Sequence, residues 1–590
     1  MRGWLKAITN CLTILIFLSA ASAQSSSTPK AIGGPYPSND SHPGPAWFVD
    51  VAKEAGLTMQ NVNGGVDTKK YIIETTGSGV AIIDYDNDGW PDIFLVNGTT
   101  LDEPKEKPTS HLYHNNHDGT FSDVTTPAGL SFSGWGQGAC VGDYDNDGFD
   151  DLYVTYYGKN RLYHNQGNGT FTEVSDLAGV AGDGKSWGTG CAFVDYDRDG
   201  KLDLLVANYV LFDVKTAPKP GDGMMCTWKG TAVMCGPRGL ESSPNILYHN
   251  LGDGKFADVS KSSGIEKTYG HYCFSVSTID YDDDGWPDIY VACDSTPSIL
   301  YHNQKNGTFT DVAPETGAAF NEDGREQAGM GSSIDDYDND GRPDIFKTNF
   351  SDDTSSLYHN NGDGTFTSTI FDAGLGLNTH YLGWGTMFID VDNDSRPDIL
   401  SVNGHVYPEV DTAHLGSAYR EPRLLYWNTG NGKFKDISPQ CGPGCTQPES
   451  SRGLAVADFW NDGRMSAVVN NMSSHPMLLV NQASNQNAWL GVIVKGTKSN
   501  RDGIGAKVTV TADGRKFVKE VRSGSSYISS NDLRLHFGLG NASKVDAIEV
   551  RWPTGNIEMF PGSSTRTFTT ITEGKGSTKE AAAPQSSKSR

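Results

Sequence analysis

The sequence predicts an all-β protein: a seven-bladed β-propeller closed by an N-terminal strand, followed by a small antiparallel β domain. Three observations support this prediction. A nine-residue acidic loop of pattern D-x-D-x-D-G-x-x-D recurs along the chain, first at Asp84 to Asp92. Strand-like apolar runs flank each copy. The last repeat lacks its fourth strand, and a segment near the N-terminus resembles the missing piece.

Each repeat contains four strand signals in the same order. A glycine-spaced run such as Gly77-Ser-Gly79-Val precedes the loop, and a run such as Ile93-Phe-Leu-Val96 follows it. The second run is apolar at successive positions, which is typical of a strand buried on both faces. A segment reading Leu112-Tyr-His-Asn115 then leads through a glycine turn to Thr120-Phe-Ser-Asp-Val124. Positive-φ turn residues favour tight hairpins, so the unit is a four-stranded antiparallel sheet.

The seventh repeat is predicted to be completed by the other end of the chain. It begins at Gly453-Leu-Ala-Val-Ala-Asp458, and its third strand is Leu478-Leu-Val-Asn481. Phe48-Val-Asp-Val51 matches the fourth strand of the first repeat. Pairing of these two segments would close the ring and remove an exposed sheet edge. A solenoid of the same units leaves both ends uncapped.

The acidic loops are predicted to bind Ca²⁺ at about six structural sites. Carboxylates at positions one, three, five and nine repel one another unless a cation lies between them, and Ca²⁺ accepts many oxygen ligands in irregular geometry. Position seven supplies a backbone carbonyl, so its side chain varies. The predicted ligands are Asp84, Asp86, Asp88, Trp90 and Asp92; Asp143, Asp145, Asp147, Phe149 and Asp151; Asp195, Asp197, Asp199, Lys201 and Asp203; Asp280, Asp282, Asp284, Trp286 and Asp288; Asp336, Asp338, Asp340, Arg342 and Asp344; and Asp390, Asp392, Asp394, Arg396 and Asp398.

Two copies of the loop depart from the pattern. The sixth has Ser395 where glycine belongs, at a cost of about 1 kcal/mol for a left-handed residue. We expect it to bind an ion more weakly. The seventh has Trp460 at position three and Ser466 at position nine, which leaves Asp458 and Asp462 as its carboxylates. We interpret this last loop as empty.

The N-terminus and the cysteines predict an exported protein. Residues 1–23 combine a basic start, an apolar run and a small-residue cleavage site, the features of a secretory signal peptide. No later stretch approaches the length of a membrane span. Eight cysteines remain after cleavage, and an even number favours disulfides in an exported chain. Spacing suggests Cys226–Cys235, Cys273–Cys293 and Cys441–Cys445, with Cys140–Cys191 by elimination.

Composition limits the partners and divides the chain. A formal net charge of -25 argues against nucleic acid, because phosphate binding needs a basic surface. The predicted divisions are a signal peptide at 1–23, a linker at 24–43, the propeller at 44–484, a second β domain at 487–562 and a disordered tail at 563–590. In the second domain, Arg501, Arg522, Arg534 and Arg551 either bind an anion or pair with acids at the domain contact.

The motifs also carry a family resemblance. The acidic loops and glycine-spaced strands resemble the FG-GAP/VCBS repeats of integrin α-type propellers. Insertions at Cys226 to Leu240 and Asn403 to Asp411, with Ser499-Asn-Arg-Asp-Gly-Ile-Gly-Ala506 and Val550-Arg-Trp-Pro-Thr-Gly555, are similar to the ASPIC/UnbV family of secreted proteins like cartilage acidic protein. The resemblance implies an exported, Ca²⁺-binding propeller without a settled activity.

Two functions remain open from the sequence. The first is a protein- or glycan-binding adhesion module, at the cell surface or in the periplasm or extracellular space. The second is a sugar-active enzyme, a lyase or dehydratase, that uses the propeller channel or top-face loops. The sequence has no H-E-x-x-H motif and no pair of acids distinct from the ion loops, so we favour binding. Side chains expected in the channel are Glu74, Trp135, Trp187, His271, Tyr272, Glu326, Trp384 and Arg452, either as a ligand site or as packing; His405 and Arg238 are the loop candidates.

Overall fold

The computed structural model describes residues 35–38, 44–102, 104, 107–484 and 486–578. The predicted signal peptide lies outside these residues, as do most of the linker and residues 579–590. None of the helices in the described part of the chain is long and apolar enough to cross a membrane.

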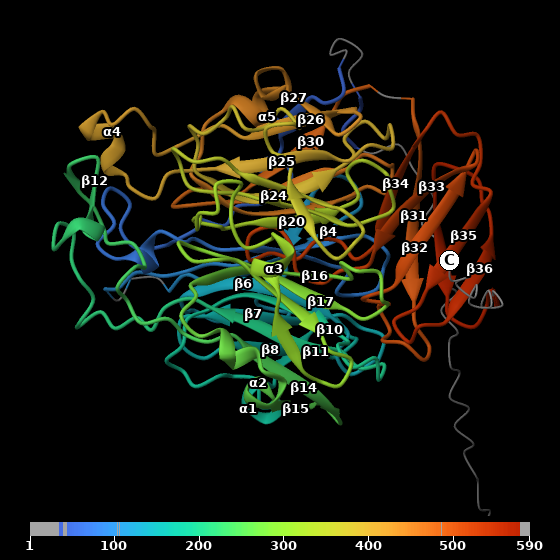
Figure 1. Cartoon of the computed structure of the whole chain (residues 1–590), viewed down its shortest axis with the longest axis horizontal. Helices are drawn as coiled ribbons and strands as arrows, with labels where there is room; N and C mark the ends of the chain where they lie inside the picture. Colours follow the sequence, from blue (N-terminus) through green and yellow to red (C-terminus); the bar gives the residue numbers. More distant parts are fainter. Residues whose placement is uncertain (1–34, 39–43, 103, 105–106, 485, 579–590) are drawn as a thin grey trace, which may run out of the picture.

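Within the described residues, seven four-stranded antiparallel sheets follow one another, which confirms the all-β class and the repeated four-stranded unit (Figure 1). We number the sheets, and the acidic loop between the first two strands of each, from one to seven. Sheet one contains β2 (Val80–Ile83), β3 (Asp92–Leu95), β4 (His111–Asn115) and β5 (Phe121–Asp123). Sheet two contains β6 (Gly136–Gly142), β7 (Asp151–Tyr156), β8 (Arg161–Asn165) and β9 (Phe171–Glu173). Sheet three contains β10 (Gly188–Val194), β11 (Asp203–Asn208), β14 (Ile246–Gly252) and β15 (Lys255–Asp258).

The remaining sheets repeat this order. Sheet four contains β16 (Cys273–Ile279), β17 (Asp288–Cys293), β18 (Ile299–Asn303) and β19 (Phe309–Asp311). Sheet five contains β20 (Ser332–Asp335), β21 (Asp344–Lys347), β22 (Ser356–Asn360) and β23 (Phe366–Ser368). Sheet six contains β24 (Gly383–Ile389), β25 (Asp398–Asn403), β26 (Leu424–Gly430) and β27 (Lys433–Asp436). Sheet seven contains β28 (Ser451–Ala457), β29 (Ser466–Asn471), β30 (Met477–Asn481) and β1 (Phe48–Asp50).

Sheet seven takes its fourth strand from the N-terminal end. β1 pairs antiparallel with β30, with Phe48 opposite Asn481 and Asp50 opposite Leu479. The first strands of successive sheets contact one another in the order β2, β6, β10, β16, β20, β24, β28, and β28 contacts β2. The second strands lie between neighbouring sheets, and every residue of β3 is buried, as its continuous apolar run predicts.

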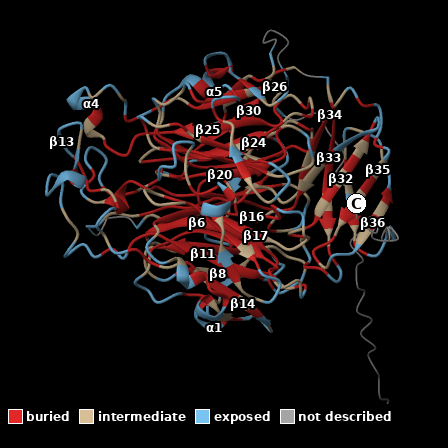
Figure 2. Ribbon diagram, in the orientation of Figure 1, coloured by how far each residue is buried: buried red, intermediate tan, exposed pale blue. Residues whose placement is uncertain are grey.

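Short helices and a hairpin occupy the connections. The helices are α1 (Ser175–Ala178), α2 (Ser260–Ser263), α3 (Ala313–Thr316), α4 (Glu409–Ala413) and α5 (Pro443–Thr446), with 3-10 turns at Ile72–Glu74, Met224–Cys226, Ile265–Thr268 and Ser438–Gln440. The hairpin of β12 (Thr227–Trp228) and β13 (Thr231–Ala232) belongs to an insertion in sheet three. This hairpin and α4 project from one side of the stacked sheets, and their surfaces are largely exposed (Figures 1 and 2).

The C-terminal strands lie on the opposite side of the stacked sheets (Figure 1). They form a three-stranded sheet of β34 (Leu535–Gly540), β31 (Ala488–Lys495) and β37 (Thr567–Thr572). A five-stranded sheet contains β33 (Arg515–Glu520), β32 (Lys507–Ala512), β35 (Ala547–Arg551), β36 (Ile557–Pro561) and β38 (Ser577–Thr578).

Two predictions for this domain were wrong. It is not purely antiparallel, because β31 pairs with β37 in parallel. Alternation along a strand reports which face is buried, but it does not report the direction of the partner strand. The disordered tail was also placed too early, since β37 and β38 lie within 563–590. Phe568 and Ile571 of β37 are buried between threonines, and this β-branched run was a strand signal that the sequence analysis missed.

All four predicted disulfides are confirmed. Cys226–Cys235, Cys273–Cys293 and Cys441–Cys445 are local, whereas Cys140–Cys191 joins β6 of sheet two to β10 of sheet three. The pair assigned by elimination is therefore the one that links two sheets.

Candidate metal centres

Each acidic loop is shaped by the aspartate at position one. In loop one, Asp84 Oδ1 accepts the backbone N–H of Asp88 at 3.0 Å, and Asp84 Oδ2 accepts that of Gly89 at 2.9 Å. Asn87 and Gly89 both have positive φ, which turns the backbone around the carboxylate. Loop six keeps this arrangement with Ser395 at a φ of 78°, so the serine does occupy the left-handed conformation.

The aspartate at position nine begins the second strand and is buried in every intact loop. Asp92 Oδ1 accepts the backbone N–H of Asn115 on β4 at 2.7 Å. Asp344 Oδ1 accepts that of Asn360 on β22 at 2.8 Å. Position nine therefore joins the loop to the third strand of its own sheet, as well as adding a charge.

Several carboxylate oxygens in the loops are buried without any hydrogen-bond partner in the protein. They are Asp86 Oδ1, Asp195 Oδ1, Asp288 Oδ2 and Asp338 Oδ1. Asp195 is 3 % exposed and Asp288 is 1 % exposed. A buried, unpaired carboxylate oxygen is costly, and a bound cation would satisfy it. This donor set fits a divalent cation.

The pKa values of the loop aspartates also favour a bound cation. Burial, together with neighbouring carboxylates, raises the pKa of Asp84 to about 7 and that of Asp195 to about 8. Burial also raises the pKa of Asp344 to about 6. Such shifts follow when several carboxylates share a desolvated site and no positive charge separates them.

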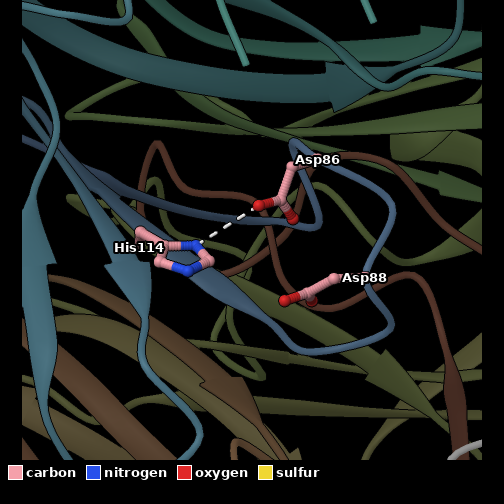
Figure 3. A group of neighbouring side chains, drawn as sticks. All are labelled: Asp86, Asp88 and His114. Atoms are coloured by element: carbon pink, nitrogen blue, oxygen red, sulfur yellow. Dashed lines mark ion pairs between the residues drawn. The ribbon is translucent and has the colours of Figure 1, made fainter. Parts of the chain in front are cut away.

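A histidine that the sequence analysis left out of the ligand set lies against five of the loops. His114 Nδ1 lies 3.4 Å from Asp86 Oδ2 and 3.4 Å from Asp92 Oδ1. Figure 3 shows the imidazole of His114 facing Asp86 with Asp88 beside them. Equivalent Asp–His groups are present at His164, His249, His302 and His359. The sequence feature that could have revealed this histidine is the repeated Leu-Tyr-His-Asn segment, in which the histidine is the third residue. In the structure it is half-buried between buried neighbours.

Loops six and seven have other residues at these places. In loop six, Trp427 replaces histidine and donates its indole N–H to Asp392 Oδ2 at 3.2 Å. In loop seven, Trp460 is buried at position three, and Arg464 forms an ion pair with Asp462, with Arg464 Nε 3.0 Å from Asp462 Oδ2. Arg342 and Arg396 make the same pair in loops five and six, but loop seven has fewer carboxylates for its arginine to balance.

The asparagine of the same segment joins each sheet to the previous loop. In sheet four, Asn303 Nδ2 donates to the carbonyl of Tyr196 in loop three at 2.8 Å and to that of Pro287 at 3.1 Å. The contacts to the previous loop are Asn115–Phe459, Asn165–Tyr85, Asn250–Tyr144, Asn303–Tyr196, Asn360–Tyr281, Asn428–Tyr337 and Asn481–Val391. Because sheet one contacts loop seven and sheet seven contacts loop six, the series includes every junction between neighbouring sheets among the seven. The sequence analysis recorded these asparagines only as parts of strands.

A C-terminal segment, residues 522–531, fills the space among the first strands. Tyr527 is fully buried, donates its hydroxyl to the carbonyl of Thr76 at 3.0 Å and packs edge-on against Trp384 at 4.7 Å. The carbonyl of Ile528 accepts the N–H of Ala139 at 3.2 Å. A Cβ on Gly79 would lie 1.9 Å from the same carbonyl oxygen. The spaced glycines of the first strands therefore make room for this segment.

The side chains expected in the channel are mainly packing. Trp135, Trp187, Tyr272 and Trp384 are buried in one cluster with Tyr527 and Ile528. Arg452 is buried, stacks on Trp384 at 4.1 Å and donates to the carbonyls of Thr75 and Gly404. Glu74 is likewise buried and accepts backbone N–H groups of Gly65 and Lys70.

The polar channel and loop candidates, His271, Arg452, His405 and Arg238, do not converge on an open site in the described residues. His405 is fully buried, and Arg452 Nη2 donates to its carbonyl at 3.3 Å. Burial, and then Arg452, lowers the pKa of His405 to about 3, so the imidazole is neutral. His271 instead donates to the carbonyl of Pro297 at 2.9 Å. Arg238 is half-exposed and pairs with Glu326 at 3.0 Å.

Basic residues of the C-terminal domain lie against acids at the face that carries the loops. Arg551 Nη1 and Lys507 Nζ each lie 2.9 Å from Asp283 Oδ1 in loop four. Arg522 pairs with Glu520 at 3.0 Å and Arg534 with Asp532 at 2.7 Å, and both acids belong to the C-terminal domain itself. The predicted pairing with acids at the domain contact is therefore found at Arg551, whereas Arg522 and Arg534 reach the sheets by donating to the carbonyls of Thr278 and Asp458. Arg501 contributes its backbone N–H, which donates to Asn146 Oδ1 at 2.7 Å.

Comparisons with known proteins agree with these features. A family model described as "ASPIC and UnbV" matches residues 496–578. A model described as "FG-GAP-like repeat" matches residues 84–154, 143–206, 233–291, 280–347 and 336–401.

The curated relatives carry one name. The chain is 26% identical over 380 residues to Cartilage acidic protein 1 of Mus musculus, covering 63% of this chain and 52% of the relative. It is 25% identical over 509 residues to that of Xenopus tropicalis, covering 81% and 70%. The chain spans about half the length of the mouse relative.

Solved structures resemble it only distantly. The BP39L lectin from Burkholderia pseudomallei matches with a TM-score of 0.42 at 9% identity, covering 70% of this chain and 98% of the lectin. The repeats, the C-terminal match and the relatives together place the chain in the ASPIC/UnbV family, with FG-GAP-like repeats before the ASPIC/UnbV domain.

Proposed function

We propose that this protein is an exported, calcium-binding, seven-bladed β-propeller that acts as a protein- or glycan-binding module. In this proposal, β1 closes the ring through sheet seven, residues 44–484 form the propeller, and loops one to six each hold one Ca²⁺ through the predicted ligands. The observation that carries the cation sites is the set of buried, unpaired carboxylate oxygens at Asp86, Asp195, Asp288 and Asp338.

Export is supported by the disulfides. Four bridges occur in the described residues, and disulfides persist in oxidising compartments. The location we propose is therefore the cell surface, the periplasm or the extracellular space.

Binding is favoured over catalysis by the contents of the channel. Tyr527 and the tryptophans fill the region where the first strands meet, and His405 and Arg452 are both buried. Because side chains fill the channel, we expect a partner to bind the loops at the surface of the ring. The insertion of sheet three presents two exposed apolar side chains, with Met224 91 % exposed and Met225 46 % exposed beside the Cys226–Cys235 disulfide. Rigid scaffolds commonly present binding residues in this way.

Calcium occupancy is tested by chelation. Six bound ions that leave on unfolding stabilise the folded state by mass action, so EDTA should lower the melting temperature by roughly 10 °C or more. Elemental analysis of the purified protein should find about six calcium ions per chain. An unchanged melt together with no bound ion would end the calcium part of the proposal.

Partner binding is tested with a glycan array and a cell-surface pull-down, each run in calcium and in EDTA. The variant with Met224→Asp and Met225→Asp should lose the captured partner while its melting temperature stays within about 1 °C, because exposed side chains contribute little to stability. Leu377→Asp is the matched control, since Leu377 is 90 % exposed in the connection between sheets five and six. Equal capture by all three proteins would place the binding surface elsewhere.

A further inference from the structure

In loops one to five, a histidine nitrogen lies between two carboxylates of the same acidic loop. We propose that these five loops bind divalent transition ions of the Mn²⁺ class through a mixed oxygen and nitrogen ligand set, whereas loop six accepts only oxygen-bound ions such as Ca²⁺. This inference rests on the proposed function in one respect, namely that the loops are cation sites. It adds histidine as a further ligand, and it divides the sites into loops one to five, which have the histidine, and loop six, which does not.

The distances repeat from sheet to sheet. The histidine Nδ1 lies 3.4, 3.4, 3.7, 4.0 and 3.4 Å from the position-three carboxylate in loops one to five. It lies 3.4, 3.1, 3.0, 3.1 and 3.2 Å from the position-nine carboxylate. Around an ion with bonds of about 2.1 Å, adjacent ligand atoms are roughly 3.0 Å apart in an octahedron and 3.4 Å apart in a tetrahedron. Most of the observed separations therefore match edges of one coordination shell.

Hydrogen bonding leaves a buried atom without a partner in loops one, three, four and five, whereas in loop two His164 Nδ1 lies 3.1 Å from Asp151 Oδ1. His114 Nδ1 and His359 Nδ1 are buried atoms with no hydrogen-bond partner, although each lies near two carboxylates. In loop four, His302 Nδ1 reaches Asp288 Oδ1 at 3.1 Å, but Asp288 Oδ2 has no partner and the residue is 1 % exposed. In loop three, Asp195 Oδ1 is in the same situation at 3 % exposure. An ion bound by both residues would satisfy the nitrogen and the carboxylate oxygen at once.

The donor set selects the class of ion. Carboxylate and carbonyl oxygens suit Ca²⁺, Mg²⁺ and Mn²⁺, whereas imidazole nitrogen suits Zn²⁺, Fe, Cu and Ni. Mn²⁺ lies at the border, because it takes carboxylates readily and binds imidazole as well. A loop with aspartates and one histidine can thus exchange Ca²⁺ for Mn²⁺, and the nitrogen adds affinity only for the second ion.

Loop six is an internal control. It has the four aspartates, but Trp427 stands where the other loops have histidine. The indole N–H donates to Asp392 Oδ2, the oxygen that faces the histidine in the other sheets. An indole nitrogen has no lone pair to offer a metal, so this loop keeps an all-oxygen set.

The test uses the full-length mature protein, stripped with a chelator and reloaded with either Ca²⁺ or Mn²⁺. Elemental analysis counts the ions, and pulsed electron paramagnetic resonance of Mn²⁺ reports ¹⁴N coupling from a bound imidazole. We expect about six Ca²⁺ per chain, and ¹⁴N coupling on about five of the bound Mn²⁺ ions.

Two variants sharpen the test in opposite directions. His359→Gln should lower Mn²⁺ affinity at one loop by at least tenfold and remove one nitrogen-coupled ion, with Ca²⁺ affinity changed by less than about threefold. Trp427→His should add a sixth nitrogen-coupled ion. Coupling that neither variant alters would show that the nitrogen comes from adventitious surface histidines and would overturn the inference.

The outcomes also separate this inference from the proposed function. If Ca²⁺ binds at six sites and Mn²⁺ shows no ¹⁴N coupling, the histidine is a hydrogen-bond donor only, and the calcium proposal stands. If neither ion binds, both proposals fail.

Discussion

Loop five and loop seven occupy equivalent places in their sheets, but they carry different charges. Asp336 accepts the backbone N–H groups of Asp340 and Gly341 at 2.9 and 2.7 Å. Asp458 accepts those of Asp462 and Gly463 at 3.0 and 2.7 Å. In both loops the aspartate at position five also accepts the backbone N–H of position seven, at 2.9 Å in loop five and 3.0 Å in loop seven. The turn therefore forms with aspartates at positions one and five alone. The further carboxylates of loop five are not required for its shape, and this difference is the clearest sign that they serve a ligand.

The two loops also differ in how their charge is balanced. Arg464 Nε lies 3.0 Å from Asp462 Oδ2, and both side chains are largely buried. Loop five has His359 beside Asp338 and Asp344, and Asp338 Oδ1 remains unpaired. Loop five also has an arginine at this position, Arg342, which pairs with Asp340, but its four aspartates exceed that single charge, and we propose that a cation balances the rest.

Arg464→Ala should have the largest effect on this comparison. Removing Arg464 takes the positive charge away from the buried carboxylate of Asp462, and breaking a buried ion pair in this way costs about 3–5 kcal/mol. Because we expect no ion in loop seven, the loss should be the same in calcium and in EDTA, measured by chemical denaturation. The control is Arg342→Ala at the same position of loop five, where the half-exposed ion pair with Asp340 should contribute less than about 1 kcal/mol. A loss at Arg464 that added calcium repairs would contradict this account.

The third-strand asparagines that donate to the previous loop should contribute equally to stability in sheet four, whose acidic loop is intact, and in sheet seven, whose loop has lost two aspartates. Asn303→Ala and Asn481→Ala each leave buried carbonyl groups without a donor, at an expected cost of about 2–4 kcal/mol. Sheets four and seven should respond alike, with or without calcium, in denaturant titrations. Asn306→Ala, in an exposed turn of sheet four, is the control. A cost seen in one sheet and absent in the other would show that the contact depends on the ion.

The effect of Asp344→Asn on stability should have opposite signs in calcium and in EDTA. In calcium, the variant loses a ligand charge, so it should bind one ion fewer and lose about 1 kcal/mol. In EDTA, it removes one of several repelling carboxylates, so it should be as stable as the parent protein or more stable. Asp462→Asn in loop seven should leave the calcium count unchanged. The same direction of change in both conditions would argue against an ion in loop five.

His405 should affect this comparison least at neutral pH, because its contribution is confined to the pH dependence of stability in acid. Its folded pKa of about 3 lies below its ordinary value of 6.5, so the unfolded chain binds a proton first. The stability that neutral His405 contributes is complete above pH 6.5 and is lost as the pH falls toward 3. His405→Asn should reduce the slope of unfolding free energy in that window by about 1.4 kcal/mol per pH unit, which is one proton. An unchanged slope would mean that other groups control the pH dependence of stability in this window. Loops five and seven are best compared above pH 6.5, where His405 is neutral in both the folded and the unfolded chain.

The repeats made much of this protein readable from its sequence. Strand order within each sheet, the positions of Asp84 to Asp92 and their copies, and three of the four disulfides followed from spacing, whereas Cys140–Cys191 followed by elimination. Local chemistry dictates these features, since a glycine turn or an aspartate at position one acts on neighbours within a few residues. The absence of a cation from loop seven follows from Trp460 and Ser466 in the same way, and it stays a prediction.

Other features were decided by contacts between distant parts of the chain. The sequence marks Gly79, but only the structure shows that the carbonyl of Ile528, from the C-terminal domain, requires it to be glycine. The same holds for Asn481, which reaches Val391 in the neighbouring sheet, and for β37, which pairs in parallel with β31. A residue's own pattern reports whether its side chain is buried, whereas its partner is set by the packing of whole sheets. The histidines belong to this second class, because only the folded sheet brings His359 on β22 against Asp338 in loop five.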